Sequence, residues 1–355
     1  MKPNLTSRRW RARFKLVHAT AAAWLLLGGL TVSSQADILY VSNSGNNTIQ
    51  KFTSAGVGSV FANTGLASPS GLAFDRAGSL YVANAGANTI VKFTGGVGAI
   101  FANGVSSTLL TPRGLAFDSA GLLLYAANQG GASIYKFDSV GNPTLFAGGT
   151  SGNLSSPRSL AFDSAGNIFA ASFGNDTIQK FSSNGVRSVF GVFPSAPFGL
   201  AVDSAGNLYV SGFFANAIYK YTRDGFFSTF ASSGLSNPGG LAFDSAGNLY
   251  AANQGNNTIE KFSSTGIDLG PFVSAGLNMP QFLAFTTDDD RPLLLTPVLS
   301  TKKSGTNVVV SWTVGGTLLS STNVTGTYSP VGGSPTSPFT NSPTGASQFF
   351  RVRLP

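Results

Sequence analysis

A five-residue motif recurs along this chain at nearly constant spacing, and it limits the possible folds more than any other feature. The motif reads Gly-Leu-Ala-Phe-Asp at residues 71–75, and its related copies end in aspartates at positions 118, 163, 203 and 244. Successive aspartates are 43, 45, 40 and 41 residues apart. Self-similarity at this period is typical of architectures that repeat one small unit many times. The first expectation is therefore a ring or a stack of like units.

Each unit contains four short runs with the composition of β-strands. The motif is the first, and a Gly-containing turn separates it from a second apolar run such as residues 80–83. An Asn/Gly loop then leads to a third run, such as residues 89–93, and to a fourth that ends in Phe-Ala, as at residues 101–102. Four short strands per unit is the pattern of a β-propeller blade. The 29 Phe and 44 Gly, with only 10% charged residues, agree with short strands and tight turns rather than helices.

The two ends of the repeat region complement one another. Residues 38–41 read as a second strand with no first strand before it, and residues 282–285 read as a first strand with no second strand after it. Together they complete one blade, which with five whole units gives six. The sequence therefore predicts an all-β fold: a six-bladed β-propeller with a composite closing blade, plus a small C-terminal β module. An open solenoid is the alternative, but it would leave exposed edges and would not need complementary half-units.

The repeat resembles a known family. The run from Pro69 to Phe93, PSGLAFDRAGSLYVANAGANTIVKF, and its copies resemble NHL repeats of the secreted bacterial type, and more distantly the streptogramin-lyase and gluconolactonase-like propellers. The resemblance covers residues 38–286 and implies the propeller fold. It does not imply one function, because such rings host ligand binding, protein binding and hydrolysis alike.

The N-terminus has the features of an export signal. Residues 1–36 are read as a signal peptide, with an apolar run at residues 21–32 and a small-residue exit at residues 34–36. The basic residues that precede the apolar run are Arg8, Arg9, Arg11, Arg13 and Lys15. The apolar run is too short to span a bilayer. We expect a secreted or cell-surface protein with no transmembrane segment in the mature chain. Export by the twin-arginine route and a retained N-terminal anchor are the alternatives.

The composition changes after Thr286, through an acidic stretch at residues 288–290, into a segment rich in Ser, Thr, Gly and Pro. The expected domains are thus a signal peptide at 1–36, the six-bladed β-propeller at 37–291 and a small β-rich C-terminal module at 292–355. Strand-like runs in the module are expected at residues 307–312, 317–320, 326–328 and 348–353. The run LLSSTNVTGTYSPV and the later FFRVR resemble the short C-terminal β modules of secreted proteins from some environmental bacteria.

The charge of the mature chain is close to balanced. The leader contains six of the 22 basic residues and none of the 14 acidic ones, which leaves 16 against 14, or a net charge of +2. A nucleic-acid partner would require a basic face, so we expect no nucleic-acid binding. There is no cysteine, so stability must come from packing and ring closure rather than disulfides. We expect a monomer.

Three sets of polar residues recur with the repeat, and each has a structural and a functional interpretation. The repeated aspartates, Asp75, Asp118, Asp163, Asp203 and Asp244, could bind a metal or act as acids, but each heads a turn and is expected to cap it. The repeated lysines, Lys51, Lys92, Lys136, Lys180, Lys220 and Lys261, could form a cationic ring, but are expected to lay their stems between blades and to pair with an aspartate. The Asn-rich loops at residues 43–48, 84–89, 128–133 and 253–258 could line a sugar site, but are expected to be structural.

Catalytic residue types are nearly missing. The only histidine, His18, lies in the leader, there is no cysteine, and Glu260 is the only glutamate, so a His-activated nucleophile cannot be assembled. The resemblance implies a metal held by carboxylates and amides in gluconolactonase-like enzymes and a histidine in streptogramin lyases, and neither set maps onto matching positions. We predict no catalytic residue, no metal and no cofactor. A lactonase-like or lyase-like enzyme and a structural cell-surface repeat protein are the alternatives.

A candidate binding site emerges where the copies of the repeat differ. The residues that follow the repeated proline are Ser70, Arg113, Arg158, Phe198, Gly239 and Gln281, and two adjacent units break the polar loop pattern at residues 172–174 and 212–214. These positions are expected at one face, around the mouth of the central channel. In our hypothesis, two arginines donate paired hydrogen bonds to a carboxylate or sulfate. Four phenylalanines form an aromatic surface that contacts an apolar group, a sugar ring or a protein side chain of the ligand. The residues are Arg113, Arg158, Phe173, Phe198, Phe213 and Phe214.

The alternative interpretation is that these aromatics fill gaps between blades and that the arginines are solvated. The sequence thus favours a non-enzymatic propeller that binds a protein, peptide or glycan ligand. The part of the ligand that contacts the arginines is expected to be anionic.

Overall fold

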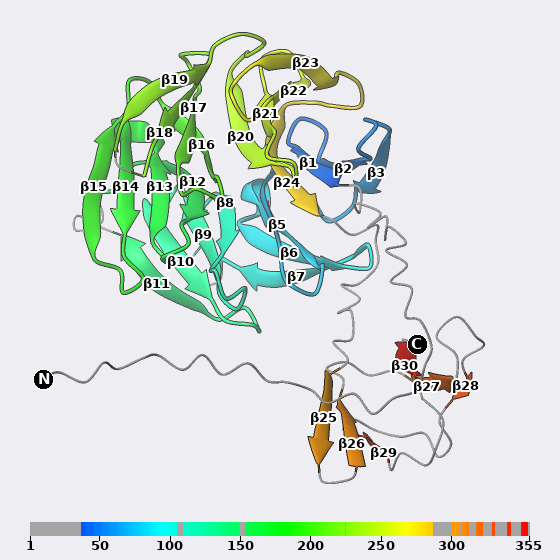
Figure 1. Ribbon diagram of the computed structural model, residues 1–355. Coiled ribbons are helices and arrows are strands. Elements are labelled where there is room, and N and C mark those ends of the chain that lie inside the picture. The colour runs from blue at the N-terminus through cyan, green and yellow to red at the C-terminus, as the bar shows by residue number, and fades with distance from the viewer. Residues whose placement is uncertain are drawn as a thin grey trace, which may run out of the picture. The chain divides into compact units, whose positions relative to one another are not determined.

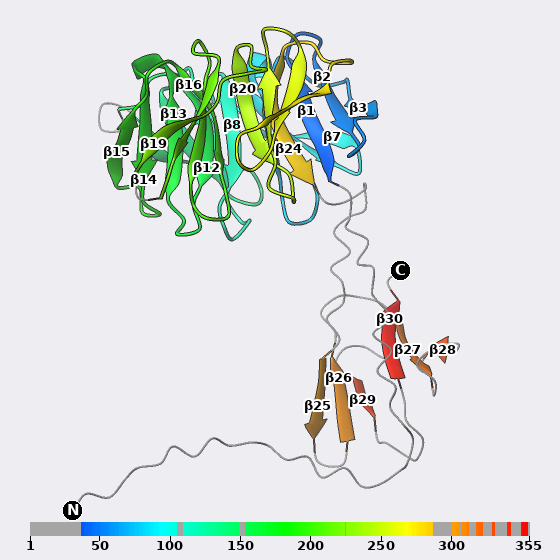
Figure 2. The same cartoon turned by 45° about the horizontal axis from the view of Figure 1, so that its top comes forward.

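The structure is a computed structural model that describes residues 37–286, except 105–108, 149–152 and 224, together with short strands between residues 300 and 353. Residues 37–286 form six antiparallel sheets of four strands each. Figure 1 shows these sheets as blades around a common centre, and Figure 2 shows the same ring from a tilted view. The predicted six-bladed β-propeller is confirmed.

The blades are numbered here from the composite one: blade 1 contains β24, β1, β2 and β3, and blades 2 to 6 follow in chain order. The innermost strands all begin at the repeated proline, and they are β24 (Pro280–Thr286), β4 (Pro69–Phe74), β8 (Pro112–Phe117), β12 (Pro157–Phe162), β16 (Pro197–Val202) and β20 (Pro238–Phe243). The second strands are β1 (Ile38–Asn43), β5 (Leu80–Asn84), β9 (Leu124–Asn128), β13 (Ile168–Ser172), β17 (Leu208–Gly212) and β21 (Leu249–Asn253).

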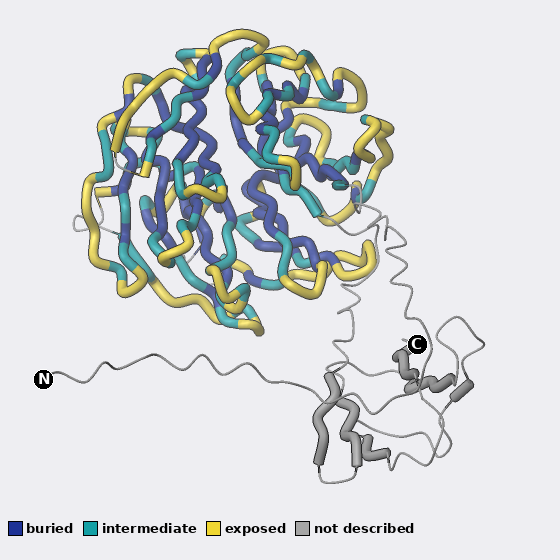
Figure 3. The backbone as a smooth tube through the Cα atoms, viewed as in Figure 1, coloured by how far each residue is buried: buried dark blue, intermediate teal, exposed yellow. Residues whose placement is uncertain are grey.

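The two outer strands of each blade complete the set. The third strands are β2 (Thr48–Phe52), β6 (Thr89–Thr94), β10 (Ser133–Phe137), β14 (Thr177–Phe181), β18 (Ala217–Tyr221) and β22 (Thr258–Phe262). The fourth strands are β3 (Gly58–Ala62), β7 (Val97–Asn103), β11 (Pro143–Gly148), β15 (Arg187–Val192), β19 (Phe227–Ala231) and β23 (Asp268–Val273). Two short 3-10 turns, η1 (Ala85–Ala87) and η3 (Phe173–Asn175), follow second strands. Burial decreases from the inner strands to the largely exposed fourth strands (Figure 3).

Blade 1 closes the ring with two segments that lie far apart in the sequence. Strand β1 pairs with β24 in an antiparallel register, with Leu39 opposite Phe285 and Val41 opposite Leu283. The innermost strands contact their neighbours all the way round, including β20 with β24 and β24 with β4. This composite blade leaves no blade interface open, as the complementary half-units predicted.

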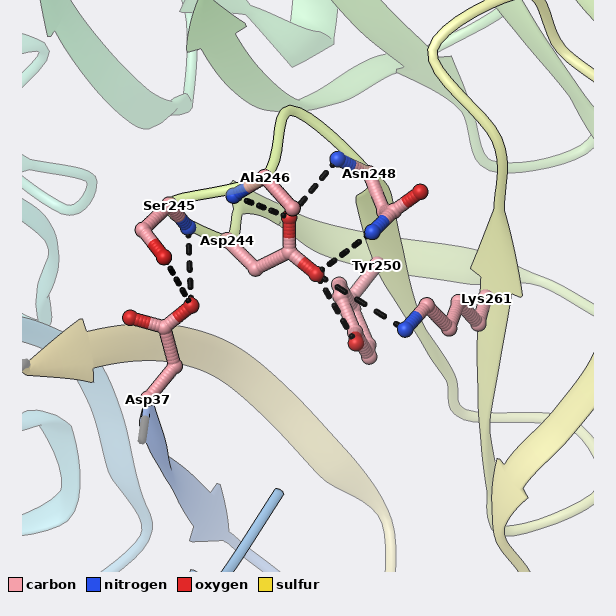
Figure 4. A network of polar contacts seen from close by, with 7 residues as sticks. All are labelled: Asp37, Asp244, Ser245, Ala246, Asn248, Tyr250 and Lys261. Atoms are coloured by element: carbon pink, nitrogen blue, oxygen red, sulfur yellow. Dashed lines mark hydrogen bonds and ion pairs between the residues drawn. The ribbon is translucent and has the colours of Figure 1, made fainter. Parts of the chain in front are cut away.

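Asp37 adds a second closure contact, between blade 1 and blade 6. Its carboxylate oxygen Oδ2 accepts hydrogen bonds from the backbone N–H of Ser245 at 2.8 Å and from the Ser245 hydroxyl at 2.7 Å (Figure 4). A charged acceptor makes these bonds stronger than neutral ones. The contact holds the start of β1 against the turn that follows β20.

The aromatic residues of the repeat form the core between adjacent blades. The ring of Tyr81, on the second strand of blade 2, packs edge-on against Phe101 of its own fourth strand at 4.9 Å and against Phe117 of blade 3 at 5.1 Å. Equivalent triads are Tyr40 with Phe61 and Phe74, Tyr125 with Phe146 and Phe162, Tyr209 with Phe230 and Phe243, and Tyr250 with Phe272 and Phe285. Such edge-to-face pairs contribute about 0.5–1.5 kcal/mol each beyond their buried area. The motif Phe and the following Tyr are thus explained by packing between blades.

The motif glycine is required where innermost strands meet. A Cβ atom added to Gly71 would lie 2.1 Å from the carbonyl oxygen of Arg113, and one added to Gly199 would lie 2.2 Å from that of Gly239. Both neighbours are backbone atoms, which cannot rotate away. The glycine therefore sets how closely the blades approach at the axis. A larger residue fits this position only where the adjoining innermost strand places different atoms next to it.

The repeated aspartates cap turns, as predicted. Asp244 Oδ1 accepts hydrogen bonds from the backbone N–H of Ala246 at 3.0 Å and of Asn248 at 2.7 Å, and its Oδ2 accepts from the Asn248 amide at 2.8 Å (Figure 4). Lys261 Nζ lies 3.7 Å from the same Oδ2 and 5.0 Å from the ring centre of Tyr250. The lysine stem thus crosses an aromatic ring to reach the turn cap, so both the aspartate and the lysine of the repeat are structural here.

The same ion pair recurs in other blades. Lys92, Lys180 and Lys220 lie 3.2, 3.8 and 4.0 Å from the corresponding aspartate oxygens. This pairing matches the predicted role of the repeated lysines. Since the side chains are partly exposed, each pair adds little stability by itself.

The Asn-rich loops are tied to the segment that enters the innermost strand of the same blade. Asn84 Nδ2 donates to the carbonyl oxygen of Gly65 at 3.1 Å and to the hydroxyl of Thr89 at 3.2 Å. Asn128 and Asn253 make the equivalent bonds to Ser133 and Thr258. These contacts confirm the structural interpretation of the loops, because the amides are used by the scaffold.

A second side chain in these loops joins each blade to the next. At five of the six positions, an Asn or Asp with a positive φ accepts a hydrogen bond of 2.7 Å from the backbone N–H of the residue that precedes the next repeated proline. The acceptor and donor pairs are Asn47 with Ser68, Asn88 with Thr111, Asp176 with Ala196, Asn216 with Asn237 and Asn257 with Met279. We call these contacts the interblade bonds. Asn and Asp tolerate the left-handed conformation that the position requires.

Blade 3 has Ala132 at this position, with φ 46°, and alanine has no side-chain acceptor. Ala132→Asn is expected to raise the free energy of unfolding by about 1 kcal/mol, because it supplies an acceptor for the N–H of Ser156 and suits the left-handed conformation better. Asn88→Ala, the reverse change, is expected to lower it by about 1–2 kcal/mol. Denaturant titrations of both variants measure the effect. If both Ala132→Asn and Asn88→Ala lowered the free energy of unfolding, the interblade bond would not be the source of stability at this position.

Residues 300–353 contribute two small sheets of three strands each. One contains β25 (Ser300–Ser304), β26 (Asn307–Ser311) and β29 (Phe339–Asn341), and the other contains β27 (Thr317–Ser321), β28 (Ser329–Pro330) and β30 (Phe349–Arg353). Strands β26, β27 and β30 lie at expected runs, β25, β28 and β29 were not predicted, and the expected run at 326–328 lies outside the described residues. The predicted signal peptide at residues 1–36 also lies outside them. No helix among the described residues has the length and apolarity to cross a membrane.

Candidate functional site

At the end of the ring where the innermost strands begin, which we call the mouth, each blade contributes two residues. The first follows the repeated proline, and the register between first and second strands shifts at this point in all six blades, as between Pro112 and Leu115. Such a β-bulge turns side chains away from the regular pleat. The second residue follows the end of the second strand, whose last residue pairs with the repeated proline, as Asn84 does with Pro69 and Ser172 with Pro157.

These positions form six pairs around the mouth, and each blade has a different pair. In order from blade 1 the pairs are Gln281 and Ser44, Ser70 and Ala85, Arg113 and Gln129, Arg158 and Phe173, Phe198 and Phe213, and Gly239 and Gln254. We call the residues of these pairs, with Phe214, the mouth residues. The packing residues of the blades repeat, whereas the mouth residues do not.

Blades 4 and 5 carry an aromatic cluster. The ring centre of Phe173 lies 6.2 Å from that of Phe198, 6.1 Å from that of Phe213 and 6.0 Å from that of Phe214. Phe198 stacks on Phe213 at 5.4 Å with an interplanar angle of 21°. Phe214 is 66% exposed, so the cluster presents an apolar surface to solvent. The structure brings the four predicted phenylalanines together.

Phe198 has a supporting place in this cluster. It is only 2% exposed, and its ring also lies 5.7 Å from that of Phe282 on β24, which is across blade 6 from it. The two rings can meet because the strand between them has Gly239 and Gly240 at the corresponding positions; a Cβ on Gly240 would lie 2.6 Å from Phe282 Cα. Phe198 therefore supports the exposed rings rather than facing a ligand itself.

The two arginines adjoin the aromatic cluster. The guanidinium carbon of Arg158 lies 4.6 Å from the ring centre of Phe173 and 5.2 Å from that of Phe198, which is cation–π geometry. Burial, and to a lesser extent the positive charge of Arg113, lower the pKa of Arg158 to about 10. Burial likewise lowers the pKa of Arg113. The two cations are therefore neighbours, each partly removed from water.

Neither arginine has a counter-charge among the described residues. In the part of the chain that the structure describes, no carboxylate forms an ion pair with Arg113 or Arg158, and no acidic group contributes to the pKa shift of either. The Nε–H of Arg113 donates to the amide oxygen of Gln129 at 2.6 Å. Arginine stays protonated at neutral pH even with a lowered pKa, so both charges persist.

Amide side chains occupy the remaining part of the mouth. The Nε2 of Gln281 donates to Oε1 of Gln254 at 3.0 Å, a bond between blades 1 and 6. Gly239 makes room for it, since a Cβ there would lie 2.5 Å from Gln254 Nε2. The amide oxygens of Gln254 and Gln129 thus both accept bonds from neighbours, and their N–H groups remain for another partner.

Unpartnered polar atoms gather at the mouth. Among the described residues, four buried side-chain atoms have no hydrogen-bond partner, and three of them belong to mouth residues: Ser70 Oγ, Arg158 Nε and Gln254 Nε2. The fourth is Asp37 Oδ1. A buried polar group without a partner costs about 1–3 kcal/mol, so such a concentration in one place calls for an explanation.

Glu260 lies on a third strand rather than among the mouth residues. It is 4% exposed on the third strand β22, beside Asp268 of β23. Burial, and then hydrogen bonding and repulsion with Asp268, raise the pKa of Glu260 to about 7. A raised pKa leaves Glu260 partly uncharged near neutral pH, which reduces the cost of burying it. Among the described residues, no three His, Cys, Asp or Glu side chains lie close enough to share a metal ion.

Sequence reasoning found the arginines and phenylalanines but missed Gln129 and Gln254 as mouth residues. Both sit in Asn-Gln-Gly loops, at residues 128–130 and 253–255, which look alike and resemble ordinary turns. The signal that could have identified them is alignment with Phe173 and Phe213, because all four follow a second strand.

The fold and the repeat define the class of this protein: it is a six-bladed β-propeller built from copies of one four-stranded unit. No model of a known protein family matches the sequence, and no curated protein matches it. Among solved structures, a chain from a nidogen–laminin complex is similar with a TM-score of 0.62 and 17% identity, covering 70% of this chain and 98% of that one.

Two further solved structures have the same fold. Virginiamycin B lyase from Staphylococcus aureus matches with a TM-score of 0.53 and 15% identity, over 78% of this chain and 88% of that one. A gluconolactonase from Xanthomonas campestris matches with a TM-score of 0.54 and 17% identity, over 77% and 86%. At these identities the likeness shows the propeller fold alone, in agreement with the resemblance of the repeat.

Proposed function

We propose that this protein is an exported, non-enzymatic propeller that binds a protein, peptide or glycan ligand through its mouth residues. One observation carries the proposal: the blades repeat their packing residues closely but differ at the mouth, where blades 3 to 5 place two arginines beside an exposed aromatic cluster. Packing does not require Phe214 to be phenylalanine, because its ring is largely in water. Exposed aromatic rings next to arginine are the residue types enriched at recognition surfaces.

The other parts of the chain fit this function. Residues 1–36 would direct export, and the module at residues 292–355 would assist attachment or spacing of a monomeric propeller. A chain of the same fold occurs in a nidogen–laminin complex, which supports a protein as one class of partner. The neighbours named as a lyase and a gluconolactonase support the fold and leave an enzymatic role as the rival proposal.

The test is a screen of glycan and peptide arrays with the full chain, followed by two matched variants. Phe214→Ala is expected to weaken binding of the selected ligand about tenfold or more, because it removes an aromatic contact, while changing stability by less than about 0.5 kcal/mol. Phe226→Ala is the control, since Phe226 is 74% exposed but lies beside the outer strand β19. Equal affinities for both variants, or turnover of a lactone or cyclic peptide by the full chain, would contradict the proposal.

A further inference from the structure

The mouth offers hydrogen-bond donors and few acceptors. Gln254 and Gln129 have their amide oxygens engaged by Gln281 and Arg113, so what they can offer is N–H. Arg158 Nε–H is buried without a partner, and the buried hydroxyl of Ser70 can donate as well. A ligand that satisfies this set has to bring acceptor oxygens.

Among the residues that the structure describes, no carboxylate pairs with either arginine of the mouth. Arg113 and Arg158 follow the repeated proline on adjacent innermost strands, and these strands touch: a Cβ on Gly114 would lie 2.7 Å from the carbonyl oxygen of Arg158. Two neighbouring cations without a counter-ion repel one another, and an anion between them would remove that repulsion. Hydrogen bonds from a guanidinium to an oxyanion are about twice as strong as neutral ones.

The aromatic cluster beside the arginines is made of carbon only. Phe173, Phe213 and Phe214 have no hydroxyl or indole N–H, so this part of the mouth satisfies no hydrogen bond of a ligand. It suits an apolar group, whereas a sugar ring presents hydroxyl groups that need partners on several sides. Since Arg158 stacks on Phe173, the charged and the apolar parts of the site are continuous.

We propose that the mouth residues bind a carboxylate carried on an apolar group, with the carboxylate on Arg113 and Arg158 and the apolar group on Phe173, Phe213 and Phe214. This inference rests on the proposed function and names the chemistry of the ligand. The carboxylate has two possible sources, a small free organic acid and the C-terminus of a peptide with an apolar last residue. Both present the same pair of oxygens beside a hydrocarbon surface.

Four small probes test the inference on the unmodified full chain by calorimetric titration. Phenylacetate has both required parts, phenylacetamide lacks the charge, acetate lacks the apolar group, and glucuronate carries its carboxylate on a sugar. Phenylacetate is expected to bind about tenfold or more tightly than each of the other three. Equal affinity for phenylacetamide would overturn the role of the arginines, and equal affinity for acetate would overturn the role of the rings. Tightest binding of glucuronate, or no binding of phenylacetate, would overturn the inference as a whole.

Variants assign the binding to the mouth. Arg113→Gln and Arg158→Gln are each expected to reduce phenylacetate affinity about tenfold, without loss of stability, because each relieves the repulsion between the two cations. Arg187→Gln is the control: Arg187 is an exposed residue of the outer strand β15, where it donates to Gln179 at 3.1 Å. Loss of affinity in the Arg187 variant as well would show a general charge effect and would contradict the assignment.

Two blocked amino acids distinguish the two possible sources of the carboxylate, a free organic acid and a peptide C-terminus. N-acetylphenylalanine and its C-terminal amide differ only in the carboxylate, and a clear preference of the first over phenylacetate indicates that a peptide C-terminus is the better fit. Failure of the carboxylate probes is distinguishable from failure of the proposed function. If binding of the array-selected ligand depends on Phe214 but no carboxylate probe binds, the proposed function is supported and the carboxylate inference is contradicted.

Discussion

Gly199→Val is expected to lower the free energy of unfolding by about 3 kcal/mol or more, and the melting temperature by roughly 6–12 °C. The added Cβ would lie 2.2 Å from the carbonyl oxygen of Gly239 and 2.9 Å from the Cα of Gly240, both on the next innermost strand. Because these are backbone atoms, the strain can be relieved only if blades 5 and 6 move apart. Such a movement would also disturb the contact of Phe198 with Phe282. Calorimetry of the full chain measures the change.

Ser159→Ala is the matched control for Gly199→Val. Ser159 occupies the same position in blade 4, where a Cβ is already accommodated, and its Oγ accepts a hydrogen bond from the N–H of Leu200 at 3.2 Å. Loss of that bond is expected to cost about 1 kcal/mol. If Gly199→Val lowered the free energy of unfolding no more than Ser159→Ala does, the innermost strands would be loosely packed at the axis. The motif glycine would then need another explanation.

Leu283→Asp is expected to release strand β24 locally, whereas Leu160→Asp is expected to unfold the whole ring. Both leucines are 5% exposed and occupy the same place on an innermost strand. Burial of a carboxylate among apolar side chains costs several kcal/mol in either blade. In blade 1, however, β24 joins the blade only by pairing with β1, so the chain can relieve the cost by detaching one strand.

Hydrogen exchange followed by mass spectrometry distinguishes the two outcomes. In the Leu283 variant, peptides that cover residues 38–43 and 280–286 are expected to lose protection while blades 3 and 4 keep it. In the Leu160 variant, protection is expected to fall in all blades together. A uniform loss of protection in both variants would show that blade 1 is no easier to open than a blade made from one continuous segment.

The fold could be predicted from the sequence because packing repeats with it. The motif Phe and the Tyr after it reappear in nearly every unit, and they form the same triad at nearly every interface. The exception is informative: Val202 replaces the motif Phe, and Phe169 accordingly has only Phe190 as its aromatic partner within that triad. The strands β25 and β29 were missed because a run such as Ser-Thr-Lys-Lys-Ser has no apolar alternation.

The candidate site could be predicted only in part. The positions of Arg113 and Arg158 follow from the motif, because any residue after the repeated proline falls in the same bulge. The burial of Phe198 could not be predicted, since it depends on two glycines in the next strand and on Phe282 beyond it. The pairing of Gln254 with Gln281 could not be predicted either, because it joins residues of two different blades. Contacts that occur once in the ring leave no periodic trace in the sequence.

The composite blade also constrains when the ring can close during synthesis. Strand β1 ends at residue 43, and its partner β24 begins only at residue 280. At roughly 5–20 residues per second, a ribosome needs on the order of 10–50 s to make the intervening segment. During that time β1 has a free edge, and its apolar residues lack the strand that will cover them. The five continuous blades can fold as they emerge, but the last interface waits until almost the whole propeller has been made.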